Sequence, residues 1–311
     1  MPYGIRNWQK IPAEIRRIAR EQIDRAIAEL DGKDGEAEDL HAAIHQARKR
    51  MKKIRALLRL VRPHIGKTYA RENAFYRDLA RGVSQIRDAE AFVDTTEALG
   101  RRFSDQIDAT AWEEIRSAFA RRRDRIAAAD AGTEDAATRL VRELKKGRRR
   151  IRSWPLDRFD AAPQLAPEAL LDGMLVTYRR ARHAMPAAFD HGSAAAFHEW
   201  RKRVKYHWYH IRIVRDLWIP VLEAFGGEAS ELADILGDGH DLDALEAFLG
   251  DDCPQAEDET LSPSARAFLL ALTARRRDSL RARARPLGMQ LLAEKPKALR
   301  KRLAAYAAAA T

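Results

Sequence analysis

The chain has 311 residues, of which 57 are Lys or Arg and 46 are Asp or Glu, so its formal net charge is +11. Its hydrophobic fraction of 46% is enough for a core and excludes a disordered polycation. A single cysteine, Cys253, excludes an intramolecular disulfide framework and a zinc site built from several cysteines. No apolar run is long enough to span a bilayer, and the first residues lack the apolar stretch of a signal peptide. We therefore expect a cytoplasmic protein without membrane insertion.

The positive charge is concentrated in three segments. Residues 45–62 hold eight Lys or Arg and no acid, residues 198–215 hold six and one acid, and residues 139–152 hold eight and one acid. These segments together carry +20, which leaves −9 for the rest of the chain. A GC-rich genome can enrich a protein in Arg, but it does not segregate charge in this way. The distribution predicts an electropositive surface and a polyanionic partner.

Apolar residues follow helical spacing through nearly the whole chain, and alternating strand patterns of useful length are absent. Two glycines in residues 32–35 end the first helix, Asp39 can cap the second, and Pro63 stops it. The acidic stretch 250–263 is predicted to be a loop. The fold class is therefore all-α. The expected helices, in chain order, cover residues 12–31, 38–62, 67–81, 87–99, 104–129, 134–152, 167–189, 193–215, 219–236, 240–249, 263–284 and 288–308.

The first basic segment recurs later in the chain. A shift of 153 residues places His45 on His198 and gives eight identities in 18 positions. The same shift places Asp88 on Asp241, and both are expected to open a helix. A shift of 154 residues superposes 120–124 on 274–278. This register indicates an internal duplication with halves at about 1–155 and 165–311, which we expect to pack with pseudo-two-fold symmetry as one cooperative unit.

The matched basic residues mostly share one face of each helix, and apolar residues occupy the opposite face. A row of like charges destabilises a helix unless a partner compensates it. Acids elsewhere in the chain could do so, but two matched faces with histidine in register favour a ligand with dense negative charge. The first face contains His45, Arg48, Lys49, Lys52, Arg55 and Arg59, and the second contains His198, Arg201, Lys202, Lys205, Tyr209 and Arg212.

Phosphate suits these side chains, because Arg offers planar bidentate contacts and Lys a mobile point charge. Few aromatic residues lie on the two faces, which disfavours stacking on single-stranded nucleic acid. Inorganic polyphosphate is therefore the favoured ligand, and nucleic acid is the alternative. A scaffold attached to granule or membrane surfaces through the same basic patch is a third interpretation. On the helix predicted at 134–152, Arg142, Lys145 and Arg149 fall near one face and could form the rear wall of a groove or simply contact solvent.

The motif H-x-x-R-(K/R)-x-x-(K/R) occurs at both histidines, and an Asp follows each His by 43 residues. These motifs, their spacing and the duplication resemble the CHAD family, the conserved-histidine α-helical domains. The stretch 177–182 resembles the family's basic helix that opens the second half, which adds Arg179 and Arg182 to the expected site. The resemblance implies one domain over 1–311, built from two pseudo-symmetric four-helix bundles around a basic central groove or pore. It also implies non-catalytic binding of polyphosphate at polyphosphate granules.

Support for a metal, a cofactor or catalysis is thin. His207 and His210 lie three residues apart, but the helical wheel turns His207 toward the apolar side, so we expect it to pack in the core. No P-loop, nucleophile elbow or His-Glu-x-x-His motif is present. Asp88 and Asp241 are expected to cap helices or to position the basic faces. We therefore predict no catalytic residue, no metal and no cofactor.

Overall fold

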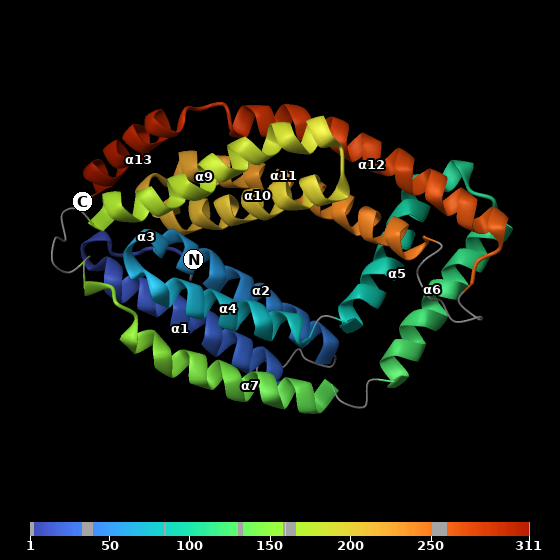
Figure 1. The fold of residues 1–311 in the computed structure, drawn as a ribbon, viewed down its shortest axis with the longest axis horizontal. Coiled ribbons are helices and arrows are strands. Elements are labelled where there is room, and N and C mark those ends of the chain that lie inside the picture. Colours follow the sequence, from blue (N-terminus) through green and yellow to red (C-terminus); the bar gives the residue numbers. More distant parts are fainter. Residues whose placement is uncertain are drawn as a thin grey trace.

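The computed structural model describes residues 3–32, 40–83, 85–129, 133–157, 159, 166–250 and 260–310, and no strand occurs among them. The chain is all-helical, as predicted (Figure 1). The helices are α1 (Ile11–Leu30), α2 (Leu40–Leu60), α3 (Arg62–Ile65), α4 (Lys67–Arg81), α5 (Gln85–Arg102), α6 (Ala109–Ala129), α7 (Thr133–Arg150), α9 (Ala166–His191), α10 (Ala194–Val214), α11 (Ile219–Phe248), α12 (Pro263–Leu291) and α13 (Pro296–Ala310).

Most predicted helix boundaries agree with the structure to within a few residues, but the helices after residue 219 differ. Gly237 and Gly239 do not interrupt α11, which runs without a break from Ile219 to Phe248. Each glycine costs a helix about 1 kcal/mol, and the packing of α11 between α10 and α12 outweighs that cost. Pro286 does not break α12 either, and the chain turns only at residues 292–295, before α13. The predicted breaks at 237–239 and 285–287 are therefore wrong.

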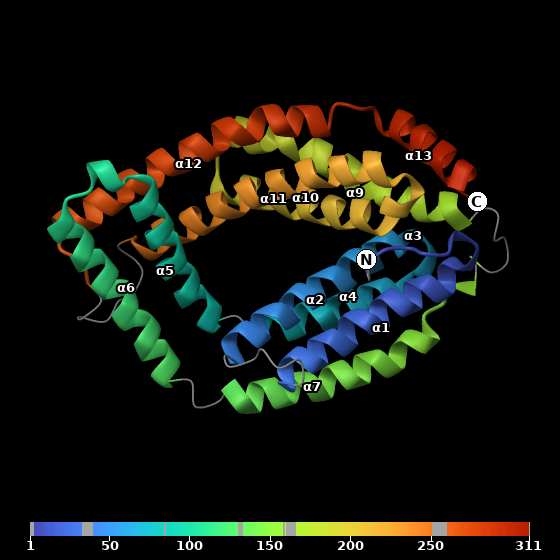
Figure 2. The same ribbon diagram turned by 180° about the vertical axis from the view of Figure 1, so that it is seen from behind.

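The helices form an elongated ring in the two opposite views (Figures 1 and 2). In the first half of the chain, α1 packs against α2 and α7, and α2 packs against α4. In the second half, α9 packs against α10 and α13, and α10 packs against α11. The α5–α6 hairpin extends away from α1, α4 and α7 and contacts α11 and α12. It therefore connects the two halves at the end of the ring opposite the C-terminus.

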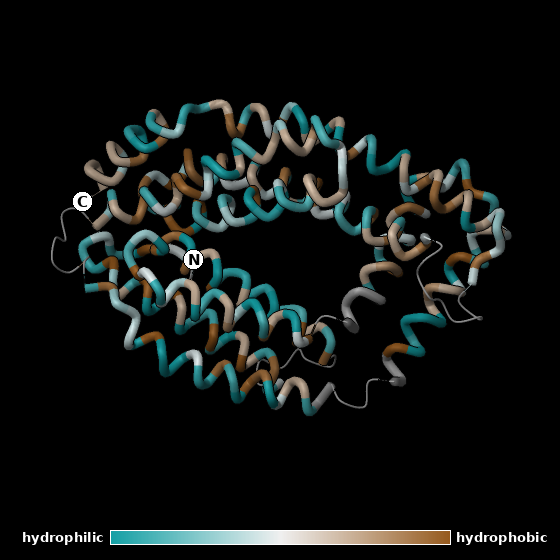
Figure 3. The backbone as a smooth tube through the Cα atoms, viewed as in Figure 1, coloured by the Kyte–Doolittle hydropathy of each residue, from teal (hydrophilic) through white to brown (hydrophobic). Residues whose placement is uncertain are grey.

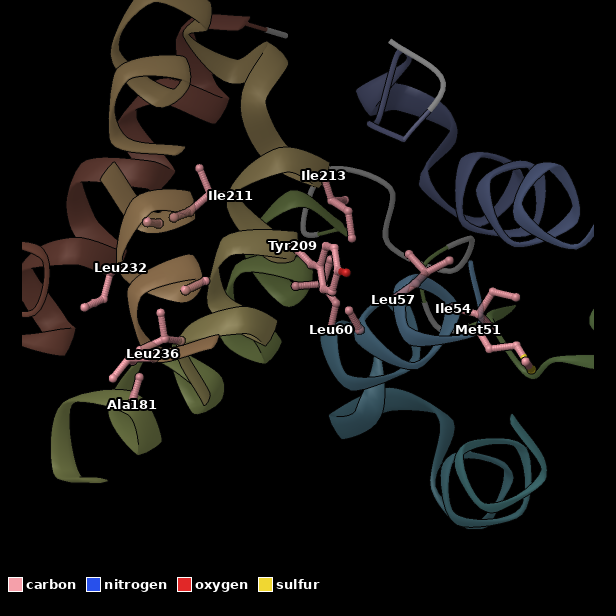
Figure 4. Close-up of a cluster of buried hydrophobic side chains, with 14 of the residues drawn as sticks. Met51, Ile54, Leu57, Leu60, Ala181, Tyr209, Ile211, Ile213, Leu232 and Leu236 are labelled. Carbon is pink, nitrogen blue, oxygen red and sulfur yellow. The ribbon is translucent and has the colours of Figure 1, made fainter. Parts of the chain in front are cut away.

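The buried apolar side chains form one cluster that includes residues from both halves. Met51, Ile54, Leu57 and Leu60 contribute from α2, and α10 contributes Ile211 and Ile213, among others (Figure 4). Hydrophobic and hydrophilic residues alternate along most helices, as in amphipathic helices that cover a core (Figure 3). The two copies of the duplicated helix, α2 and α10, contact each other directly. In the part of the chain that the structure describes, no helix is long and apolar enough to cross a membrane.

Gly173 of α9 sets how closely α9 approaches the C-terminal end of α2. A Cβ atom there would lie 1.6 Å from the carbonyl oxygen of Leu60. We expect Gly173→Ala to lower the free energy of unfolding by about 2–3 kcal/mol, because the backbone of α2 must move. At Gly227 in α11, a Cβ atom would have no neighbour within 4 Å, so Gly227→Ala should raise stability by about 0.5–1 kcal/mol. Urea unfolding of both variants tests this, and equal stability of the pair would contradict the close α2–α9 packing.

Candidate anion-binding site

The site lies where the two copies of the basic helix, α2 and α10, come together. His210 of α10 places its Nε2 2.9 Å from the carbonyl oxygen of Ala56 in α2, which joins the two helices inside the core. Near the surface, Lys205 of α10 is close enough to Lys49 of α2 for their positive charges to repel each other. Basic side chains from both copies thus converge, as the duplication predicts.

Lys205 is a half-buried cation of this cluster. Its pKa is lowered, first by burial and then by the charges of Arg201 and Lys49. Asp234 and Asp241 of α11 act in the opposite direction and favour its charged form. A bound polyanion would also favour the charged form of Lys205, because it would bring negative charge to cations that repel one another.

His198 and His240 form a pair beside these cations. Their Nδ1 atoms are 3.3 Å apart and their ring centroids 4.3 Å apart. Burial, His240, Lys202 and Arg201 together lower the pKa of His198 to about 4, whereas Glu199 acts against them. Burial, Arg201 and Lys52 lower the pKa of His240 to about 4. Both rings are therefore neutral at neutral pH. In that state the Nδ1–H of one ring can donate a hydrogen bond to the unprotonated Nδ1 of the other.

Acidic side chains of α11 balance part of the positive charge. Asp234, Asp238 and Asp241 follow helical spacing, and burial raises the pKa of Asp238 in spite of the nearby Arg276. Asp238, Asp241 and Arg276 also line a cavity of about 260 Å³ between α5, α11 and α12. The expectation that Asp241 opens a helix is wrong, because Asp241 lies inside α11 and next to Lys205, where it supports the basic face. The side chain of Asp88 lies outside the described residues.

Three arginines of α2 contact α4, and one of them also contacts Tyr206 of α10. Arg48 donates from Nη1 to the carbonyl oxygen of Ala80, and Arg55 donates from Nε to Asn73 Oδ1 at 3.2 Å. The Arg59 guanidinium lies 4.2 Å from the ring centroid of Tyr206 in α10, and it also donates to the hydroxyl of Tyr69. These contacts hold the charged groups in place, and such an arrangement would lower the entropy lost if an anion bound there.

Four further predicted site residues lie on α2 and α10. His45 and Lys52 are partly exposed on α2. On α10, Lys202 is exposed and pairs with Glu199, so one acid of the segment offsets its charge. Arg201 lies across α11, with its Nε 3.7 Å from the position that a Cβ on Gly237 would occupy. A side chain larger than alanine at position 237 would therefore contact Arg201, which is one of the predicted phosphate-binding residues.

Tyr209 is the clearest error among the predicted site residues. Its side chain is only 3% exposed and belongs to the buried cluster (Figure 4). It stacks on Trp208 and meets Tyr3 edge to face. Burial raises its pKa to about 12. Arg212 lies beside the same group, with its guanidinium 5.2 Å from the Trp208 ring. A helical wheel of α10 alone cannot show that the N-terminal residue Tyr3 covers this part of the helix.

Two further sets of predicted residues lie outside the surface where Lys49 and Lys205 meet, although Arg179 also borders a hollow lined by Ala196, Glu199 and Arg203 of α10. Arg142, Lys145 and Arg149 are exposed on α7, which packs on α1 at the outer side of the ring (Figure 1). They do not form the rear wall of a surface shared by α2 and α10. Arg179 and Arg182 are exposed on α9 and line a separate groove next to α12 and α13.

Sequence reasoning assigned Asp241 a possible positioning role, but it did not place His240, Tyr206, Asp234 or Asp238 at the site. The i, i+4, i+7 spacing of residues 234, 238 and 241 was a usable signal, because it places the carboxylates on one helical face. His207 and His210 are buried at 3% and 0% exposure, which confirms core packing for His207. Among the described residues, no group of three or more His, Cys, Asp or Glu side chains is arranged to hold a metal ion.

Comparison with known proteins assigns most of this sequence to one family. A model of the CHAD domain family matches residues 17–250, which include both copies of the histidine motif and the helices α2, α10 and α11. No curated protein matches the chain. The match covers well over half of the sequence and contains the duplicated basic helices, and on this basis the chain belongs to the CHAD family.

Proposed function

We propose that this protein binds inorganic polyphosphate without catalysis, in a basic groove between the surfaces of α2 and α10. The observation that carries the proposal is the convergence of Lys49 with Lys205, and of Lys52 with His240, from opposite halves of the chain. Lys49 and Lys205 repel each other in the free protein, and a ligand with one negative charge per unit relieves that repulsion and the repulsion among their cationic neighbours. The family match supports the same class of ligand.

The similar packing of the two halves supports a pseudo-symmetric binding groove. The first helix of each half, α1 or α9, contacts the basic helix and the last helix of that half. The basic helix of each half, α2 or α10, then contacts the helix that follows it. We infer that two related bundles place their basic helices side by side, so that the groove lies between the halves.

Nucleic acid is the alternative ligand, and the aromatic side chains near the site argue against it. Single strands bind by stacking bases on exposed aromatic rings. Arg59 already covers the ring of Tyr206, and Trp208 stacks on the buried Tyr209. Bases would therefore have to displace these contacts, whereas a chain of phosphates needs only the cations.

A direct comparison of ligands tests the proposal. Long-chain polyphosphate and a mixed-sequence oligonucleotide are titrated at equal phosphate concentration and about 150 mM salt, with affinity measured by calorimetry. We expect polyphosphate to bind at least about ten-fold tighter. Equal or tighter binding of the oligonucleotide would contradict the proposal. In cells, we expect a fluorescent fusion of the protein to accumulate at polyphosphate granules.

A further inference from the structure

Arg179 and Arg182 of α9 border a groove that the polyphosphate proposal does not use. The groove lies between α9, the end of α12 and the start of α13, and it has a volume of about 980 Å³. Arg182 donates from Nε to the carbonyl oxygen of Leu292 at 2.9 Å, which ties α9 to the turn between α12 and α13. A second hollow of about 470 Å³ shares Arg179 and His183 with it and continues along α9 toward α10.

The floor of this groove is apolar. Met185, Phe189 and Leu292 line it, and Phe189 packs against Phe197 and Trp200 of the core behind it. Met289 is 61% exposed at its edge and is one of only three large apolar side chains that are exposed among the described residues. An exposed methionine beside an apolar hollow is typical of adaptable protein-binding surfaces.

The rim of the groove is positively charged. Arg179, Arg182 and Arg285 line it, and the Arg285 guanidinium lies 5.2 Å from the Phe189 ring centroid. Among the described lining residues of the larger hollow, Asp190 is the only acid. An occupant must therefore combine negative charge at its edges with apolar groups at its centre.

We propose that this groove docks an acidic amphipathic helix of a partner protein. The lining of α9 runs from Arg179 to His191, a length of about 18 Å, which matches a helix of about three turns. Such a helix places an apolar stripe on the floor and Asp or Glu residues against the rim arginines. Polyphosphate has no apolar part to fill the floor, and the surface of a bilayer does not enter a recessed groove.

A synthetic helical peptide provides the probe. We would label a peptide of about 14 residues that carries Leu at i, i+4, i+7 and i+11 and Glu on both flanks. Fluorescence anisotropy should show at least about ten-fold tighter binding than for a scrambled peptide, or for one with Lys in place of Glu. In methyl NMR spectra the Met289 and Met185 signals should shift, whereas the signal of the fully buried Met51 of α2 should not. Equal binding of the scrambled peptide would overturn the proposal.

Variants separate this groove from the polyphosphate site. Met289→Glu and Arg285→Glu should each weaken peptide binding by about ten-fold or more and leave polyphosphate binding unchanged. Ile219→Glu is the matched control, since Ile219 is also exposed, at 46%, and does not line the groove. Saturating polyphosphate should not displace the peptide, because the two ligands bind at different places. The peptide titration needs no polyphosphate, so it remains a valid test even if the protein does not bind polyphosphate. The docking proposal would be overturned if polyphosphate displaced the peptide or if Met289→Glu bound the peptide as tightly as the unaltered protein. It would also be overturned if the protein bound anionic lipid vesicles and Met289→Glu abolished that binding.

Discussion

Replacing Lys49 and Lys205 together by glutamine is expected to weaken polyphosphate binding by about a hundred-fold or more. Each substitution would remove one charge-assisted hydrogen bond to phosphate, which contributes roughly 1.5–3 kcal/mol to the binding free energy. The free protein should tolerate the change to within about 1 kcal/mol, because burial and neighbouring cations already disfavour the charge of Lys205. Calorimetric titration measures the loss of affinity, and thermal unfolding without ligand measures the stability.

Lys145→Gln with Arg149→Gln is the matched control for this double variant. It removes the same amount of charge, but from exposed positions on α7 at the outer side of the ring. The long-range attraction of the whole protein for a polyanion therefore falls equally in both double variants. We expect the control to bind within about two- to three-fold of the unaltered protein. An equal loss of affinity in both would mean that net charge, and not the surface shared by α2 and α10, accounts for binding.

The duplicated helix carried most of what the sequence could predict. Helical spacing placed α2, α4 and α10 within two residues of their observed ends, because their apolar faces are regular and uninterrupted. The register of His45 with His198 predicted a pair of related basic helices, and α2 and α10 are both helical and contact each other, whereas a shared binding site on them stays a prediction. These successes depend on local periodicity and on repetition, both of which a single sequence records.

The errors arise where neighbouring elements decide the outcome. Tyr209 shares a helical face with Lys205, but contact with Tyr3 near the N-terminus buries it. Gly237 favours a break when α11 is considered alone, but packing against α10 and α12 keeps the helix continuous. Arg182 of α9 was predicted to join the basic faces of α2 and α10, but it lines the groove next to α12 and α13 and donates to the carbonyl oxygen of Leu292. No pattern within one helix contains these distant contacts.

The His198–His240 pair predicts that polyphosphate binding takes up protons. In the free protein both pKa values are about 4, below the ordinary value of 6.5, because the rings are buried among Arg201, Lys52 and Lys202. Glu199 is the acid that acts on His198 in the opposite direction, and Asp243 and Arg281 line the same small hollow as the two rings. Phosphates bound beside these cations would offset their charge and raise both pKa values.

The direction of the pH effect follows from these shifts. Without ligand, His198 and His240 take up protons near pH 6.5 in the unfolded chain, but in the folded protein they do so only near pH 4. The contribution of the pair to folding stability is therefore lost as pH falls from about 6.5 to 4. With ligand, the folded pair also becomes protonated in this range. Polyphosphate affinity should therefore rise by roughly ten- to a hundred-fold as pH falls from about 7 to 5.

Calorimetry in buffers of different ionisation enthalpy measures the proton uptake directly. At about pH 5.5 we expect up to one proton taken up for each binding site filled, held by the pair as a whole, because a second proton would place two charged rings with their Nδ1 atoms 3.3 Å apart. His198→Gln with His240→Gln retains two polar side chains of similar reach but cannot take up protons, so its affinity should not change with pH over this range. If that variant keeps the pH dependence of the unaltered protein, the protons are bound elsewhere. If the unaltered protein binds equally well at both pH values, the pair stays neutral beside the bound phosphates, and its role is limited to holding α10 against α11.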